Sequence, residues 1–211
     1  MKIVIMGAPS SGKGIQAKLI EDKYGLKHIS TGQILRDFVQ SGTPEAQRVK
    51  IIINNGDLID DATMCKIVAE KLECEKDNYV LDGFPRTKKQ AEFLIKNYCP
   101  NFAFYLNTSV NVALDRVLNR LVCPVCKKSY NKKDLKNYVC SNDKANLVVR
   151  DDDTPEIFLK RFKTFEKENK PILNLFKKAG VLREIANDGD ISTSFEQIKL
   201  LIDNSIGEMN D

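Results

Sequence analysis

The sequence lacks tryptophan and contains a single histidine, His28, among 211 residues. One histidine excludes a two-histidine metalloprotease site and a three-histidine zinc site, and it leaves at most one histidine base. Because His28 adjoins Ile29, Ser30 and Thr31, we expect it to end a short strand rather than to act as a catalyst.

Long hydrophobic runs are also missing. No apolar stretch approaches the roughly 18 residues that a membrane-spanning helix needs. Met1 and Lys2 lead directly into an apolar run of a few residues, which is too short for the core of a signal peptide. We therefore expect a cytoplasmic protein that does not contact a membrane.

The composition is that of an ordinary globular protein, with 42% hydrophobic and 29% charged residues. A chain of 211 residues can bury one sizeable core and carry small insertions. The net charge of +4 is too mild to indicate nucleic acid, but it suits small anionic ligands. The six cysteines are expected to be free thiols or metal ligands in a reducing compartment.

A glycine-rich loop follows the first apolar run, Ile3–Met6. It reads Gly-Ala-Pro-Ser-Ser-Gly-Lys-Gly at residues 7–14 and leads into a helical pattern. A strand, a loop of this kind and a helix form the phosphate-binding arrangement of P-loop proteins, in which Lys13 reaches the outer phosphates. The strict pattern has Ser or Thr after the lysine to hold Mg²⁺, whereas this chain has Gly14 and Ile15.

Short apolar runs and helical patterns alternate along the chain. The runs Ile3–Met6, Tyr79–Leu81, Phe102–Leu106 and Val181–Ile185 are typical of strands buried on both faces. Gly25 ends the first helical pattern as a C-terminal cap. This alternation predicts a doubly wound α/β fold with a central parallel sheet, whose ligands bind at the carboxyl ends of the strands.

Two segments interrupt the alternation. Residues 31–59 have helical patterns without a clear strand, and residues 121–153 are rich in lysine, cysteine and tyrosine. We expect both to be insertions in the α/β core. A helix then begins with Thr154 as its N-cap and Pro155 as its first residue.

Asp82 follows the second strand and precedes the turn Gly83-Phe84-Pro85-Arg86. Beside a P-loop, an acid in this place is where a Walker-B aspartate organises hydrated Mg²⁺. The alternative is an aspartate that merely ends a strand. The two interpretations stay open on the residues alone.

Several motifs together resemble the adenylate kinases, in order and over nearly the whole chain. The motifs are Gly-x-Pro-x-x-Gly-Lys-Gly at 7–14, Ser-Thr-Gly-x-x-Leu-Arg at 30–36, Asp-Gly-Phe-Pro-Arg-Thr at 82–87, Arg-x-x-x-Arg at 116–120, Arg-x-Asp-Asp at 150–153, and Arg161. The resemblance implies a P-loop nucleoside monophosphate kinase fold and the reaction ATP + AMP = 2 ADP. It also implies a core of residues 1–29, 60–119 and 154–211, an AMP-binding insertion at 30–59 and a lid at 120–153.

The resemblance further implies roles for individual residues. The ATP site would contain Gly7, Ser10, Ser11, Gly12, Lys13, Gly14, Ile15, Arg116, Arg120, Ser129, Tyr130 and Gly189. The AMP site would contain Thr31, Arg36, Asp57, Leu58, Ile59, Gly83, Phe84, Pro85, Arg86, Gln90, Arg150 and Arg161. The catalytic groups would be Lys13, Asp82, Arg86, Arg120, Arg150 and Arg161, with Asp82 in the water shell of Mg²⁺.

The chemical requirements of phosphoryl transfer support this assignment independently. A phosphate that attacks another phosphate is already an anion, so the reaction needs positioning and charge neutralisation rather than a general base. A chain with many arginines and one histidine fits that demand. Arg116 and Arg120 are four residues apart, and we expect them on one helix face, where two cations repel unless an anion lies between them.

Three residues depart from the family pattern. Ile15 replaces a threonine, Gln33 replaces an aspartate and Ser10 replaces a loop glycine. The absence of a hydroxyl at Gly14 is normal for the family, so the anomaly lies at Ile15. We expect weaker engagement of Mg²⁺ and ATP than in a typical member, without loss of activity.

Cys123-x-x-Cys126 and Cys140-x-x-Asp143 form two knuckles separated by thirteen residues. This spacing indicates a structural zinc site with three thiolates and one carboxylate, a ligand set that some bacterial adenylate kinases also use. A redox dithiol is the alternative, but such a pair should follow a strand rather than lie in an insertion. Cys65, Cys74 and Cys99 have no partner at ligand spacing and are expected to be ordinary thiols.

Other functions stay open at this point. The chain could phosphorylate UMP or CMP, bind nucleic acid through the basic segment around Tyr130 and Tyr138, or be a nucleotide-binding regulator without activity. The expected partners are ATP, AMP and ADP, without nucleic acid, and the resemblance suggests a monomer.

Overall fold

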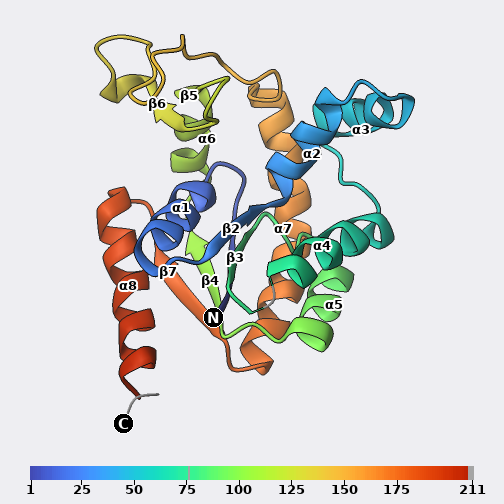
Figure 1. The fold of residues 1–211 in the computed structure, drawn as a ribbon, viewed down its shortest axis with the longest axis vertical. Coiled ribbons are helices and arrows are strands. Elements are labelled where there is room, and N and C mark those ends of the chain that lie inside the picture. Colours follow the sequence, from blue (N-terminus) through green and yellow to red (C-terminus); the bar gives the residue numbers. More distant parts are fainter. Residues whose placement is uncertain (76, 209–211) are drawn as a thin grey trace.

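The computed structural model describes residues 1–75 and 77–208. Its centre is a parallel sheet of five strands (Figure 1). In spatial order these are β2 (Lys27–Ser30), β3 (Tyr79–Asp82), β1 (Lys2–Gly7), β4 (Phe102–Asn107) and β7 (Leu182–Ala186). The four strands predicted from apolar runs are confirmed, and His28 lies in the fifth strand, β2.

The described part of the chain contains eight α-helices. They are α1 (Lys13–Tyr24), α2 (Thr31–Gln40), α3 (Pro44–Asn54), α4 (Asp61–Glu75), α5 (Lys88–Tyr98), α6 (Val110–Leu118), α7 (Pro155–Lys178) and α8 (Ile191–Glu208). Helices α1 and α8 cover one face of the sheet, and α4, α5 and α7 cover the other. This is the predicted doubly wound architecture.

The strands form because their side chains are apolar on both faces of the sheet. Ile3, Val4 and Ile5 of β1 are fully buried, and they divide between the two hydrophobic clusters. Val4 packs in the cluster of α4, α5 and α7, whereas Ile3 and Ile5 pack in the cluster of α1 and α8. Alternate residues therefore anchor β1 between two helical layers, which fixes the loop that follows it.

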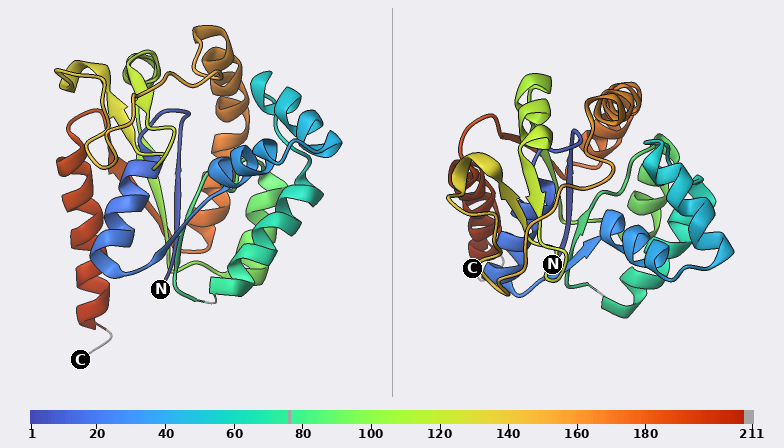
Figure 2. Two further views of the ribbon diagram at one scale, coloured as in Figure 1. Left: turned by 45° about the horizontal axis from the view of Figure 1, so that its top comes forward. Right: turned by 90° about the horizontal axis from the view of Figure 1, so that it is seen from above.

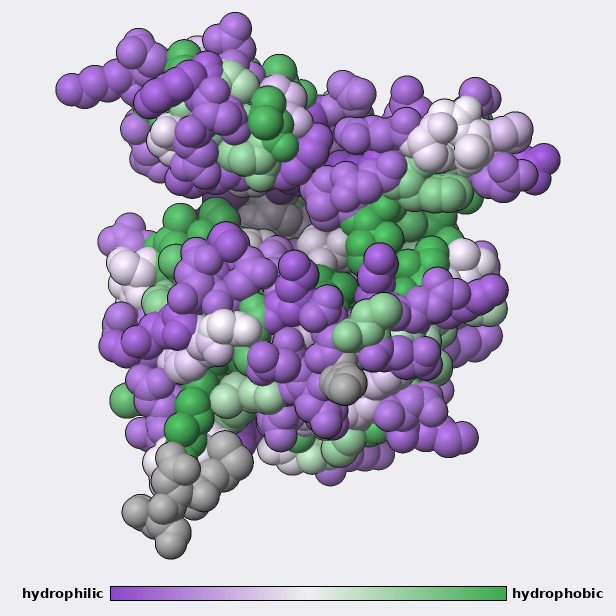
Figure 3. Space-filling model, in the orientation of Figure 1, coloured by the Kyte–Doolittle hydropathy of each residue, from purple (hydrophilic) through white to green (hydrophobic). Residues whose placement is uncertain are grey.

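Two segments extend beyond the sheet at the end where β1 leads into its loop (Figures 1 and 2). One is the α2–α3 segment, residues 31–59. The other is the cysteine segment, residues 120–153, which contains the antiparallel strands β5 (Arg120–Val122) and β6 (Ser129–Asn131) and the short 3₁₀ helix η1 (Lys132–Asp134). Figure 3 shows a hollow between these two segments and the sheet.

The expectation that Arg116 and Arg120 share a helix face is wrong. Helix α6 ends at Leu118, Asn119 is its C-cap, and Arg120 begins β5. The helical apolar spacing continues to Leu121, but Leu121 packs with the buried cysteines of the cysteine segment rather than with α6. Tertiary packing therefore ends the helix earlier than the spacing predicts.

Helix α7 is the longest element, with 24 residues. As predicted, Thr154 caps its N-terminus by accepting a hydrogen bond from the Ile157 N–H. Near this end Phe158 packs against α6, and near the other end Ile172 and Phe176 are buried in the sheet cluster. The helix therefore runs from the base of the cysteine segment to the far end of the sheet (Figure 1).

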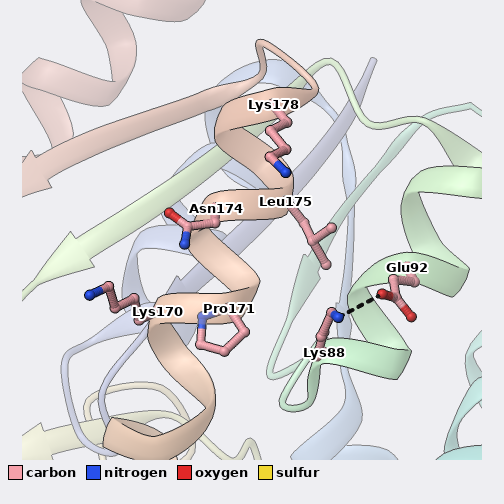
Figure 4. A pocket seen from close by; sticks show the side chains of 7 residues that line it. All are labelled: Lys88, Glu92, Lys170, Pro171, Asn174, Leu175 and Lys178. Atoms are coloured by element: carbon pink, nitrogen blue, oxygen red, sulfur yellow. Dashed lines mark ion pairs between the residues drawn. The ribbon is translucent and has the colours of Figure 1, made fainter.

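A groove of about 440 Å³ lies between α5 and α7 (Figure 4). It is lined by Lys88, Glu92, Lys170, Pro171, Asn174, Leu175 and Lys178. Lys88 and Glu92 form an ion pair of 3.5 Å across one turn of α5. None of the residues that the sequence predicts to bind nucleotide lines this groove. In the described part of the chain, no helix is long and apolar enough to cross a bilayer.

Candidate functional site

The glycine-rich loop joins the carboxyl end of β1 to the N-terminus of α1. Gly7 has no room for a side chain, because a Cβ there would lie 2.8 Å from the Leu106 carbonyl oxygen. Gly12 has a φ of 92°, which glycine adopts without strain, and it is the N-cap of α1. The loop also contains Ser10 and the fully buried Ser11, and Gly14 and Ile15 form the first turn of the helix. The free N–H groups of this turn face an anion in P-loop proteins.

Lys13 folds back over this loop. Its ammonium donates hydrogen bonds to the Gly7 and Ala8 carbonyl oxygens, at 2.9 and 2.6 Å. Burial lowers the pKa of Lys13 to about 8, and the nearby positive charges of Arg86 and Arg120 oppose the raising effect of Asp82. An ammonium with too little neutralising charge around it is suited to receive an anion.

Asp82 lies at the end of β3, beside the start of α1. A Cβ on Gly14 would be 3.4 Å from its carboxylate, and the Nε2 of His28 is 3.6 Å from it. Burial by itself raises the pKa of Asp82, but His28 and Lys13 outweigh this effect and lower it below the usual value. Asp82 is therefore a buried carboxylate that stays ionised at the base of the glycine-rich loop. A hard oxygen ligand in this position fits hydrated Mg²⁺.

The turn after Asp82 meets the start of α2. The Thr31 hydroxyl donates to the Asp82 carbonyl oxygen at 3.2 Å. Gly83 must be glycine, because its φ is 82° and a Cβ would lie 2.7 Å from the Thr31 hydroxyl. Phe84 is buried, the Phe84–Pro85 peptide bond is cis, and the Arg86 Nε donates to the Gly83 carbonyl oxygen at 2.8 Å. The parallel register of β2 and β3 thus brings the motifs at 30–36 and 82–87 together.

The remaining AMP-site candidates lie on α2, just before α4, and on α5. Arg36, one turn into α2, donates to the Gln33 side-chain oxygen at 3.0 Å from Nη2. Asp57 pairs with Lys160 at 2.7 Å, Leu58 follows it, and Ile59 is buried in the sheet cluster. Gln90 is buried in the first turn of α5.

Three further arginines point toward the same region from the other segments. Arg120 forms a two-bond ion pair with Asp153, and Arg161 pairs with Asp152 at 2.8 Å and donates to the Ile53 carbonyl oxygen at 3.0 Å. Burial, together with the positive charges of Arg120 and Arg36, lowers the pKa of Arg150 to about 10. Several cations therefore converge on a space whose positive charge is offset in part by Asp82, Asp152 and Asp153. Such an arrangement can bind polyphosphate.

Arg116 joins the loop to the C-terminal part of the chain. Its guanidinium donates to the carbonyl oxygens of Ser11, Asn187 and Gly189, at 3.2, 2.9 and 3.1 Å. This brings Gly189 beside the phosphate loop. Ser129 and Tyr130 lie on β6, and the Tyr130 hydroxyl faces Cys140 and Ser141.

Comparisons with known proteins decide the family. The family model described as adenylate kinase matches residues 5–181. An adenylate kinase of Petrotoga mobilis is 38% identical over 189 residues, covering 84% of this chain and 86% of the relative. An adenylate kinase of Clostridium kluyveri is 35% identical over 213 residues, covering 94% and 96%. The chain belongs to the adenylate kinase family.

Adenylate kinases are nucleoside monophosphate kinases that interconvert ATP plus AMP and two ADP, with Mg²⁺ bound to ATP. An adenylate kinase of Mesomycoplasma hyopneumoniae is similar as well, with 37% identity over 190 residues, covering 86% of this chain and 88% of the relative. The fold, the enzyme class and the resemblance read from the motifs are therefore confirmed. The roles of single residues stay predictions.

The cysteine segment brings its four predicted ligands together. One ligand atom each from Cys123, Cys126, Cys140 and Asp143 lies within 4.8 Å of the others. The Cys126 and Cys140 sulfurs are 3.5 Å apart, near the value of about 3.8 Å that tetrahedral zinc with bonds of about 2.3 Å to sulfur requires. Three thiols and a carboxylate therefore fit a zinc ion.

Groups around Cys123 and Cys140 also suit thiolates, whereas the neighbouring Cys140, Asp143 and Cys123 side chains raise the pKa of Cys126 to about 11. The backbone N–H groups of Val125 and Cys126 donate to the Cys123 sulfur at 3.3 and 3.4 Å. Burial raises the pKa of Cys140, but hydrogen bonds from Tyr130 and from backbone N–H groups outweigh it and lower this pKa to about 7. In the described part of the chain, Cys65, Cys74 and Cys99 lie outside this group of possible metal ligands.

Sequence reasoning missed several residues at the site. It treated His28 as a strand end, but the imidazole faces Asp82. It quoted Asp152 and Asp153 only as part of a motif, although they pair with Arg161 and Arg120. The signal for these aspartates was available, because clustered arginines require anions nearby when no substrate is bound.

Proposed function

We propose that this chain catalyses ATP + AMP = 2 ADP at the space enclosed by the glycine-rich loop, the turn at 83–86 and the arginines of three segments. The observation that carries this proposal is the convergence of Lys13, Arg36, Arg86, Arg120, Arg150 and Arg161 on one region. Two polyphosphate chains that face each other need such a concentration of positive charge.

The two nucleotides bind on opposite sides of the transferred group. ATP lies on the loop, with Lys13 on its outer phosphates, Arg116 and Arg120 beside it, and backbone near Ser129, Tyr130 and Gly189 along its base. AMP lies on the α2–α3 side. Its phosphate is held by Arg36 and Arg86, its base contacts Thr31 and Gln90, and the backbone of Asp57, Leu58 and Ile59 lines its pocket.

Catalysis comes from positioning and from charge stabilisation. The AMP phosphate is already an anion, so no side chain removes a proton. Arg150 and Arg161 approach the transferred phosphoryl group together with Arg120, and Asp152 and Asp153 give up their arginines to the phosphates. Asp82 would hold the water shell of Mg²⁺, which would supply further neutralisation of the phosphate charge.

We assign the structural roles accordingly. Residues 1–29, 60–119 and 154–211 form the core, residues 30–59 bind AMP, and residues 120–153 act as a lid that excludes water when it closes. Zinc on Cys123, Cys126, Cys140 and Asp143 is structural, since four protein ligands leave no open position. The protein is a cytoplasmic monomer.

A coupled assay for ADP formation with AMP, CMP, UMP and GMP tests this function. We expect turnover with AMP and at least about 100-fold lower kcat/KM with the other three, because an adenine pocket leaves its polar groups unpaired by other bases. Turnover with UMP or CMP at the same level would establish the alternative kinase. Nucleotide binding without turnover would establish a regulator.

A further inference from the structure

The side-chain amide of Gln90 hydrogen-bonds to one donor and to one acceptor. Its oxygen accepts a hydrogen bond from the Arg86 backbone N–H at 2.8 Å, and its nitrogen donates to an Asp61 carboxylate oxygen at 2.9 Å. An N–H can only donate and an ionised carboxylate can only accept. The chemistry of these partners therefore fixes which end of the amide is oxygen and which is nitrogen.

Asp61 is itself held at the junction of two helices. It lies in the first turn of α4, and the same carboxylate oxygen accepts from the Thr87 hydroxyl at 2.8 Å. The Thr87 oxygen in turn accepts from the Gln90 backbone N–H at 3.2 Å and is the N-cap of α5. The acid, the cap and the amide thus form a closed network, in which the amide cannot rotate without breaking two hydrogen bonds.

We propose that Asp61 determines the specificity for adenine by preventing the Gln90 amide from flipping. This rests on the proposed function, in which Gln90 contacts the AMP base. An amide has two N–H donors and two acceptor lone pairs, so one of each is left for a ligand. That remaining pair matches adenine, which offers its 6-amino donor beside the N1 acceptor.

The 6-oxopurines present the reverse pattern, with an acceptor at position 6 and a donor at N1. A freely rotating amide pairs with either base by turning over. In this structure a flipped Gln90 places its N–H groups against the Arg86 N–H and its oxygen against the Asp61 carboxylate. These two repulsive contacts inside the protein oppose binding of a 6-oxopurine. The site then selects adenine by disfavouring the competing base.

Asp61→Asn removes one of these two repulsive contacts with little change in shape, because an asparagine amide can either accept from Gln90 or donate to it, while the contact with the Arg86 N–H remains. The readout is the ratio of kcat/KM for AMP to kcat/KM for IMP. We expect this ratio to fall at least about 5-fold, mainly through a lower KM for IMP, while kcat with AMP stays within about 2-fold.

Asp60→Asn is the matched control, since Asp60 is adjacent and caps α4 through the Thr63 N–H without contacting Gln90. Its ratio should equal that of the unmodified protein. An unchanged ratio in Asp61→Asn, or an equal fall in Asp60→Asn, overturns the proposal.

Gln90→Leu separates this inference from the function on which it rests. If Gln90→Leu loses discrimination but Asp61→Asn keeps it, Gln90 contacts the base and the role of Asp61 is wrong. If Gln90→Leu still discriminates while the unmodified chain converts AMP, the placement of the base on Gln90 is wrong and the inference fails with it. Loss of discrimination in both variants, with thermal unfolding unchanged, supports Asp61 as a positioning residue.

Discussion

The sheet and the cysteine segment hold their functional residues by different means. The glycine-rich loop follows β1, whose central residues are fully buried between two helical layers. The buried core of the cysteine segment contains four residues, Leu121, Cys123, Cys140 and Leu147, and two of these are proposed metal ligands. Apolar burial therefore fixes the loop, whereas the cysteine segment has too small a core to be stable without a further link.

This difference predicts which part of the protein each kind of substitution affects. A change in the loop should remove chemistry and leave the fold intact. A change at the cysteines should loosen residues 120–153 and leave the sheet intact.

The largest effect is expected for Lys13→Met. We expect kcat to fall by about 10³-fold, because the variant loses a positive charge on the transferred phosphates. The unfolding temperature should stay within a few degrees, since Lys13 is not part of the apolar clusters. Steady-state kinetics and calorimetry measure the two quantities, and a large loss of stability would show that the loop is not held by β1 alone.

Cys140→Ser should act on the other region. Without a complete ligand set, amide exchange in residues 120–153 should accelerate by about 100-fold, while exchange in β1 and β4 stays unchanged. Hydrogen-exchange mass spectrometry resolves these regions. Cys74→Ser is the control, because Cys74 is an exposed free thiol on α4.

Treatment of the unmodified protein with a chelator should reproduce the result of Cys140→Ser. If neither treatment changes exchange in residues 120–153, metal does not stabilise the cysteine segment.

The lowered pKa of Lys13 predicts a pH dependence of ATP binding. Burial lowers this pKa to about 8, so the free enzyme loses the Lys13 proton as the pH rises through 8. Bound phosphate favours the protonated form, and KM for ATP should therefore increase above pH 8 by up to about tenfold per unit. In Lys13→Arg the guanidinium stays protonated, and KM should be nearly flat over this range. An equal slope in that variant would assign the titration to another group.

Ile15→Thr should give the smallest effect. Ile15 lies in the first turn of α1, half-buried beside the loop. A hydroxyl there adds one polar contact near the phosphates and Mg²⁺, so KM for Mg²⁺ and ATP should fall by about 3-fold. Unchanged kcat and KM would show that Ile15 does not weaken nucleotide binding.

The sequence predicts the sheet well because buried strands are continuous apolar runs, and β1 and β4 are clear examples. The prediction for Arg120 is wrong, because the apolar spacing of α6 continues to Leu121, which packs in the cysteine segment. The motifs indicate which arginines meet. They do not reveal that Asp152 and Asp153 neutralise two of them, or that Asp61 orients Gln90, because these contacts join segments that are distant in the chain.

The length of helix α7 determines where Arg161 lies relative to the sheet. At the rise of an α-helix its 24 residues correspond to a length of about 36 Å. Arg161 near one end contacts the α2–α3 segment through Ile53, and Asn169 further along donates to the Tyr105 hydroxyl of β4 at 3.0 Å. Inserting one residue between these positions would turn Arg161 by about 100° and shift it by about 1.5 Å relative to the sheet. The position of Arg161 relative to the sheet is thus set by a whole number of helix residues, and it should tolerate substitution in the helix far better than insertion or deletion.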